Sequence, residues 1–137
     1  MPSMEDKEFE KIVKKAVKDI PEEFVEKLEN VDIFIQDWPN THQVENLRKK
    51  GHGKGLVFGL YEGIPQTRRA RYGLGGPLPD KITIFKVPTL MVSKSYNELV
   101  RNVQDTVIHE IGHHFGMNEK EIANAMKVRR QSVNKKK

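Results

Sequence analysis

The stretch VIHEIGHHFGMNE, residues 107–119, decides the fold, because it joins a helical apolar pattern to a cluster of ionisable side chains. His109 and His113 are four residues apart, so a helix places one imidazole a turn above the other. On a helical wheel they share a polar stripe with Asn102 and Thr106, opposite the apolar residues. The stretch therefore predicts a helix whose exposed side presents two potential metal ligands.

Glu110 completes the pattern HExxH, in which two histidines bind a metal and the glutamate between them is a general base. Zinc lowers the pKa of a bound water toward about 7, so that a carboxylate can remove its proton. Glu110 lies beside the metal stripe but is turned away from direct ligation. The pattern predicts a hydrolytic site with Glu110 as the catalytic residue.

The third histidine of the stretch, His114, falls in the apolar half of the wheel. We interpret it as a packed, hydrogen-bonded core histidine, and the alternative is a partner of Glu110 one turn earlier. His42 and His52 are weaker ligand candidates that we expect at the surface.

A third metal ligand is needed, since catalytic zinc sites usually have three protein ligands and a water. The chain has no cysteine, so the ligand is His, Asp or Glu. Gly116 stands where helices often end in the left-handed conformation, and a reversal there brings Glu119 back toward the histidines. We predict one zinc ion held by His109, His113 and Glu119. Two alternatives remain: the helix dipole favours an acid at position 119, and Glu121 fits a capping box with Asn118.

The remaining elements predict an α+β domain. The spacing of apolar residues, the caps and the turn residues indicate helices, then a strand, a helix, two strands and two final helices. The expected helices cover residues 5–19, a short segment after Pro21, 40–50, 95–116 and 118–131, and the expected strands cover 31–38, 55–63 and 80–88.

Length and charge limit the function classes. With 137 residues the chain fits one domain, which we place at 1–130, with a basic, disordered tail at 131–137. The net charge of +5 gathers in this tail and in TRRARYG, and a lysine-rich end is typical of a solvated terminus, so nucleic acid is an unfavoured partner. No apolar run could span a membrane and no signal peptide is recognisable, so we expect a cytoplasmic protein without a membrane partner.

The segment IPQTRRARYGLGGPLP, residues 64–79, is too long for a tight turn and is expected to be a functional loop. With the strand before it, the segment offers donors for an oxyanion or for substrate: Tyr61, Arg68, Arg69 and Tyr72. The alternative is a basic surface loop with Tyr61 packed at a strand end. Either the strand at 55–61 or the strand at 81–87 could bind an extended peptide at its edge.

Three blocks together, TVIHEIGHHFGMNEKEI, GLYEGIP and LPDKITIFK, resemble the minimal-zincin family of small bacterial zincin-like metallopeptidases. The resemblance covers residues 8 to 126. It implies a compact domain with a small twisted sheet of three to four strands packed on the HExxH helix and flanking helices. It also implies His109 and His113 as metal ligands and Glu110 as the base. Members commonly have Asp at the position of Glu119, so the longer side chain here is a departure.

The residues and the resemblance together predict a zinc-dependent metallopeptidase that acts on a peptide or protein substrate. The small size and the lack of an obvious substrate-binding subdomain leave two alternatives open. One is a metal-stabilised binding or regulatory module with little or no peptidase activity. The other is a regulatory protease specific for one partner protein.

Overall fold

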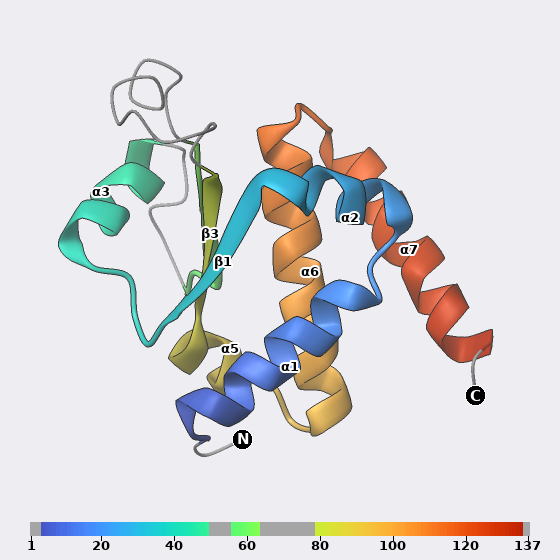
Figure 1. Ribbon diagram of the computed structural model, residues 1–137, viewed down its shortest axis with the longest axis horizontal. Coiled ribbons are helices and arrows are strands. Elements are labelled where there is room, and N and C mark those ends of the chain that lie inside the picture. The colour runs from blue at the N-terminus through green and yellow to red at the C-terminus, as the bar shows by residue number, and fades with distance from the viewer. Residues whose placement is uncertain (1–3, 50–55, 64–78, 136–137) are drawn as a thin grey trace.

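The computed structural model describes residues 4–49, 56–63 and 79–135, which form helices around a small sheet (Figure 1). The described elements, in chain order, are α1 (Asp6–Lys18), α2 (Glu22–Lys27), the 3-10 turn η1 (Leu28–Asn30), β1 (Val31–Gln36), α3 (Thr41–Lys49), β2 (Gly59–Glu62), β3 (Asp80–Phe85), α5 (Lys86–Val92), α6 (Tyr96–His114) and α7 (Glu119–Lys135).

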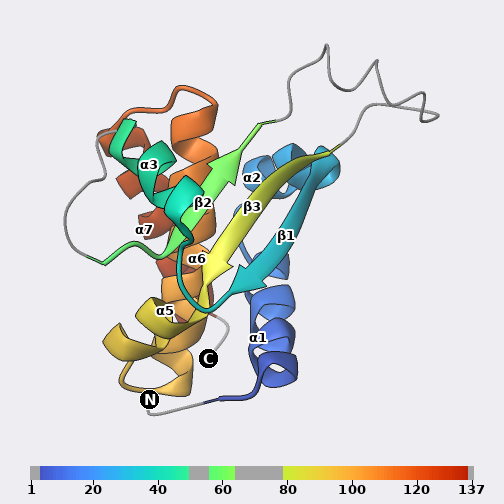
Figure 2. The ribbon, with the colours of Figure 1, turned by 90° about the vertical axis from the view of Figure 1, so that its left-hand side faces the viewer.

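Within the described part of the chain, the sheet has three strands in the order β1-β3-β2 (Figure 2). β3 pairs with β1 in parallel and with β2 antiparallel, so β3 is central and β2 is an edge strand. The central position explains why Ile82, Thr83 and Ile84 are all fully buried. In β1 the side chains of Val31, Ile33 and Ile35 are half-buried and alternate with the exposed Asp32 and Phe34.

Helix α6 forms the middle of the core, where it packs against α1 and against β2 and β3; α1 and α6 lie on one side of the sheet and α3 on the other (Figure 1). Its apolar face buries Leu99, Val103, Val107, Ile108 and Ile111 completely. α1 packs through Phe9, Ile12, Val13 and Ala16, which are all buried. The α+β prediction is therefore confirmed, with three strands in the sheet.

One helix was not predicted. We expected a strand over residues 80–88, but β3 ends at Phe85 and α5 follows directly. Pro88 has no N–H for a strand ladder and is tolerated in the first turn of a helix. Thr89 supports this turn, because its Oγ1 donates to the carbonyl of Phe85 at 2.7 Å. The strand predicted at 55–63 is also shorter, since β2 covers only Gly59–Glu62.

The predicted helix ends are mostly confirmed. Ser95 caps α6, accepting a hydrogen bond from the N–H of Glu98 at 3.1 Å, and Asn40 caps α3 through the N–H of Gln43 at 2.9 Å. The last helix is longer than predicted, because α7 runs to Lys135, while the domain limits 1–130 and 131–137 stay predictions.

Two further predictions concern the loop at 64–79 and the absence of a membrane span. Arg68, Arg69 and Tyr72 lie outside the described residues, as does all of the predicted loop except its last residue. Within the described ranges, no helix has both the length and the apolar character that crossing a bilayer requires.

Candidate metal centre

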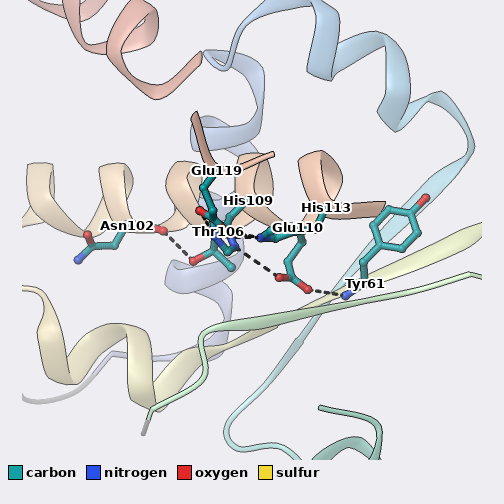
Figure 3. Close-up of polar contacts among 7 residues, drawn as sticks. All are labelled: Tyr61, Asn102, Thr106, His109, Glu110, His113 and Glu119. Carbon is teal, nitrogen blue, oxygen red and sulfur yellow. Dashed lines mark hydrogen bonds and ion pairs between the residues drawn. The ribbon is translucent and has the colours of Figure 1, made fainter. Parts of the chain in front are cut away.

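His109 and His113 project from the last two turns of α6 toward the same point (Figure 3). Their Nε2 atoms are 3.3 Å apart, and the rings meet edge to face with centroids 4.4 Å apart. Both side chains are partly open to solvent, at 34% and 39% exposure. Two imidazole nitrogens thus converge at an accessible position, as the spacing of the pair predicted.

The chain reverses at Gly116, whose φ of +80° lies in the left-handed region that glycine adopts without strain. The N–H of Met117 donates to the carbonyl of Gly112 at 2.8 Å, and the N–H of Gly116 donates to the carbonyl of His113 at 3.2 Å. These two bonds are the pattern of a Schellman helix end. The predicted chain reversal at Gly116 is confirmed.

Helix α7 begins directly after this turn. The side chain of Asn118 accepts from the N–H of Glu121 at 2.8 Å, while Glu121 accepts from the N–H of Asn118 at 3.1 Å. This reciprocal pair is the predicted capping box. It satisfies the first turn without Glu119, whose carboxylate is directed to the two histidines (Figure 3).

The carboxylate of Glu119 lies 2.8 Å from Nε2 of His113 and 3.4 Å from Nε2 of His109. One ligand atom from each of the three residues falls within 4.8 Å of the others. Ligands about 2.0–2.1 Å from a tetrahedral zinc ion lie about 3.3 Å from each other, so this donor set fits zinc. We call His109, His113 and Glu119 the candidate metal centre.

Gly112 allows α7 to approach α6 closely enough to deliver Glu119. A Cβ atom at this position would lie 2.7 Å from Cγ1 of Ile122 and 2.9 Å from its Cδ1. Ile122 is itself 1% exposed and belongs to the core. The close packing of Gly112 and Ile122 therefore sets the separation of the two helices that supply the candidate metal centre.

Glu110 lies beside the candidate metal centre but faces the sheet. Its Oε1 accepts a hydrogen bond from the backbone N–H of Tyr61 at 3.0 Å, and its Oε2 lies 3.9 Å from Nδ1 of His109 (Figure 3). The Glu110 side chain is 15% exposed. Its carboxylate thus approaches the metal stripe from the side, as the helical wheel predicted.

The pKa of His109 is raised above its usual value. The main cause is the Glu110 carboxylate, which interacts with the imidazolium, and the negative charge of Glu119 adds to the effect, whereas burial acts in the opposite direction. In the metal-free protein, protons therefore compete for the imidazole that the candidate metal centre needs in its neutral form.

Tyr61 is packed near the end of β2, as one of the two interpretations of the sequence expected, whereas His114 takes a position that the sequence did not predict. The Tyr61 side chain is buried, and its hydroxyl donates to Oδ2 of Asp80 at 2.8 Å, directed away from Glu110 (Figure 3). The ring of His114 stacks on the ring of Tyr61, with centroids 3.9 Å apart and planes at 19°. The prediction of a core histidine is wrong, since His114 is 38% exposed. His114 is the last residue of α6. At this end the apolar side of the helix extends beyond the residues that cover it, so a side chain on this side is exposed.

An open cleft of about 800 Å³ adjoins His109 and Glu110. Its walls come from the segment around β2, from α6 and from α3, α5 and α7, and they carry apolar side chains such as Leu56, Phe58, Val92 and Met126. Gly59 narrows the gap between strand and helix, because a Cβ there would lie 2.5 Å from Cγ2 of Thr106. Asn102 and Thr106 line the cleft, and their polar stripe on the helical wheel is the feature of the sequence that indicated an uncovered side of α6 here.

Comparison with known proteins identifies one family. A family model described as "Zincin-like metallopeptidase" matches residues 28–127. No curated protein matches the chain. The matched region runs from η1 into α7 and includes the candidate metal centre, Glu110 and Tyr61.

Proposed function

The chain belongs to the zincin-like metallopeptidase family, and we propose that it is a hydrolase that cleaves peptide bonds with one zinc ion and Glu110 as the catalytic base. One observation carries the proposal: two imidazoles and a carboxylate converge within 4.8 Å, and a second carboxylate lies beside them at an open cleft. This arrangement supplies three ligands, a base and room for a substrate.

In this proposal His109, His113 and Glu119 hold the ion, and the two imidazoles do so as neutral groups. Zinc, when bound, lowers the pKa of a water ligand to about 7 and polarises a carbonyl oxygen. The carboxylate of Glu110 accepts the proton of the attacking water and then passes it to the leaving amine. The N–H of Tyr61, 3.0 Å from Oε1, limits the rotation of this carboxylate.

The substrate in this proposal is an extended peptide or an unfolded protein segment. β2 is the strand nearest Glu110 and lies at the edge of the sheet, whereas β3 is paired on both sides. Of the two strands considered from the sequence, only β2 can therefore offer main-chain groups to a peptide. The apolar side chains of the cleft favour a substrate with apolar residues near the cleaved bond. We also propose a cytoplasmic location and no nucleic-acid partner.

The test is hydrolysis of a denatured protein mixture by the zinc-loaded chain, with new N-termini identified by mass spectrometry. Wild type should generate cleavage products that a chelator abolishes, and Glu110→Gln should lose activity by about 10²- to 10⁴-fold while binding the same amount of zinc. Glu121→Gln is the matched control, because it alters an acid of the adjacent helix outside the candidate metal centre. Full zinc-dependent hydrolysis by Glu110→Gln would contradict the proposed mechanism.

A further inference from the structure

We propose that Tyr61 is a positioning residue for Glu110, and that Asp80 and His114 fix Tyr61 in this role. The inference rests on the proposed function only in taking Glu110 as the base. It concerns a cluster of three side chains outside the candidate metal centre: the phenol of Tyr61, the carboxylate of Asp80 and the imidazole of His114.

Tyr61 and Glu110 are joined by a hydrogen bond at the edge of the sheet. In the antiparallel pair of β2 and β3, Phe58 accepts a hydrogen bond from Phe85 at 2.8 Å, so alternate residues of β2 turn their main-chain groups toward β3. Tyr61 has the opposite parity, and its N–H is directed outward from the sheet. Oε1 of Glu110 accepts a hydrogen bond from this N–H at 3.0 Å. A main-chain donor of the edge strand thus holds the carboxylate in place.

Tyr61 is itself held in place by two side chains, those of Asp80 and His114. Its hydroxyl donates to Oδ2 of Asp80 on β3 at 2.8 Å, and the residue as a whole is only 3% exposed. His114 covers the ring at a stacking distance of 3.9 Å, and its Nε2 lies 3.9 Å from Oδ2 of the same aspartate.

The hydrogen bond of Glu110 and the stacking of His114 both join α6 to β2. Glu110 and His114 are one turn apart on α6, and both touch the same residue of β2. The stack therefore fixes the distance between α6 and β2 next to the hydrogen bond of the base. Without the stack the strand can move away from the helix, and the carboxylate loses its anchor while the candidate metal centre, built from α6 and α7, keeps its ligands.

This separation predicts a specific kinetic effect. Misplacing a catalytic group by about 1 Å can cost up to about 100-fold in rate. We expect His114→Ala to lower kcat by about 10-fold or more on a peptide found in the cleavage screen. Zinc affinity should stay within about twofold of wild type, because the ligands on α6 and α7 do not change, whereas KM should rise if the displaced β2 also binds the peptide less well. His114→Phe should restore kcat, since it keeps a ring against Tyr61.

The control is Tyr96→Ala at the other end of α6. It removes an exposed aromatic ring that faces Nζ of Lys15 at 5.3 Å and lies far along the helix from Glu110. Its kcat should equal that of wild type. An equal loss of kcat in Tyr96→Ala and His114→Ala, or no rescue by His114→Phe, would overturn the positioning role.

A second measurement does not need activity. Residue-resolved amide hydrogen exchange of the full chain should show a protected Tyr61 N–H in wild type, which exchanges about tenfold faster in Glu110→Ala and in His114→Ala. Unchanged exchange in Glu110→Ala would overturn the inference, because Glu110 would not hold this N–H. The expected exchange pattern in a wild type that cleaves nothing would support the contact and overturn the proposed hydrolysis.

Discussion

The backbone N–H of Tyr61 donates to Oε1 of Glu110 at 3.0 Å and joins two residues that are 49 positions apart in the chain. Tyr61 belongs to the edge strand β2 and Glu110 to the HExxH helix α6, so the bond connects the strand that we propose as the peptide-binding edge to the group that we propose as the base. In the proposed function, substrate binding and proton transfer therefore share one boundary, between β2 and α6.

The third ligand is tested by Glu119→Ala. We expect zinc affinity to fall by about 100-fold or more, since even the outer partners of metal ligands contribute about 10- to 100-fold. Competition with a chromophoric chelator measures the affinity. Glu121→Ala is the control: it breaks the capping box and costs about 1 kcal/mol of stability, but should leave zinc affinity unchanged. Equal affinities of Glu119→Ala and wild type would exclude Glu119 as a ligand.

The packing of α6 on α7 is tested at Gly112. An added methyl group meets Ile122 at 2.7 Å, so Gly112→Ala should lower the free energy of unfolding by about 1–3 kcal/mol and should weaken zinc binding as α7 shifts. Ile122→Ala removes the obstructing atoms and leaves a cavity.

In the double variant the new methyl group occupies part of this cavity, so its loss of stability should be smaller than the sum of the two single losses. Urea denaturation of the metal-free proteins measures all three. Additive losses would show that Gly112 and Ile122 do not determine each other's packing.

The pH dependence follows from the raised pKa of His109. Because the pKa is higher in the folded state, protonated His109 stabilises the metal-free protein fully below pH about 6.5, and this contribution is lost as the pH rises through the raised value. Zinc binding has the opposite dependence, because the ion displaces the proton, so affinity should fall as the pH is lowered.

Thermal unfolding with and without zinc between pH 5 and 9 measures both effects. The stabilisation by zinc should grow as the pH rises through the raised pKa of His109. A stabilisation by zinc that is independent of pH would contradict a site that contains His109.

The features that the sequence predicted correctly depend on near neighbours. The stripe of His109 and His113 and the reversal at Gly116 both follow from residues within a few positions, where helical geometry determines the outcome. The predicted end of β3 was wrong, because an apolar run such as KVPTLMV is compatible with a buried strand or a buried helix. Pro88 favours the helix, since it lacks the N–H that a strand ladder needs.

The features that the sequence could not predict depend on distant segments. The edge position of β2 is a consequence of the parallel pairing of β1 with β3, whose residues are 49 positions apart. His114 was placed in the core because a helical wheel has no information on where the covering sheet ends. The cleft combines five elements or their flanking segments, so composition and spacing give little sign of it.

The most direct test of the central claim is a crystal structure of the zinc-loaded protein, with anomalous diffraction recorded at the zinc absorption edge. We predict one anomalous peak about 2.0–2.2 Å from Nε2 of His109, from Nε2 of His113 and from a carboxylate oxygen of Glu119, with Glu110 beside the ion but not bound to it. A peak held by other residues, or no peak among these three side chains, would contradict the account.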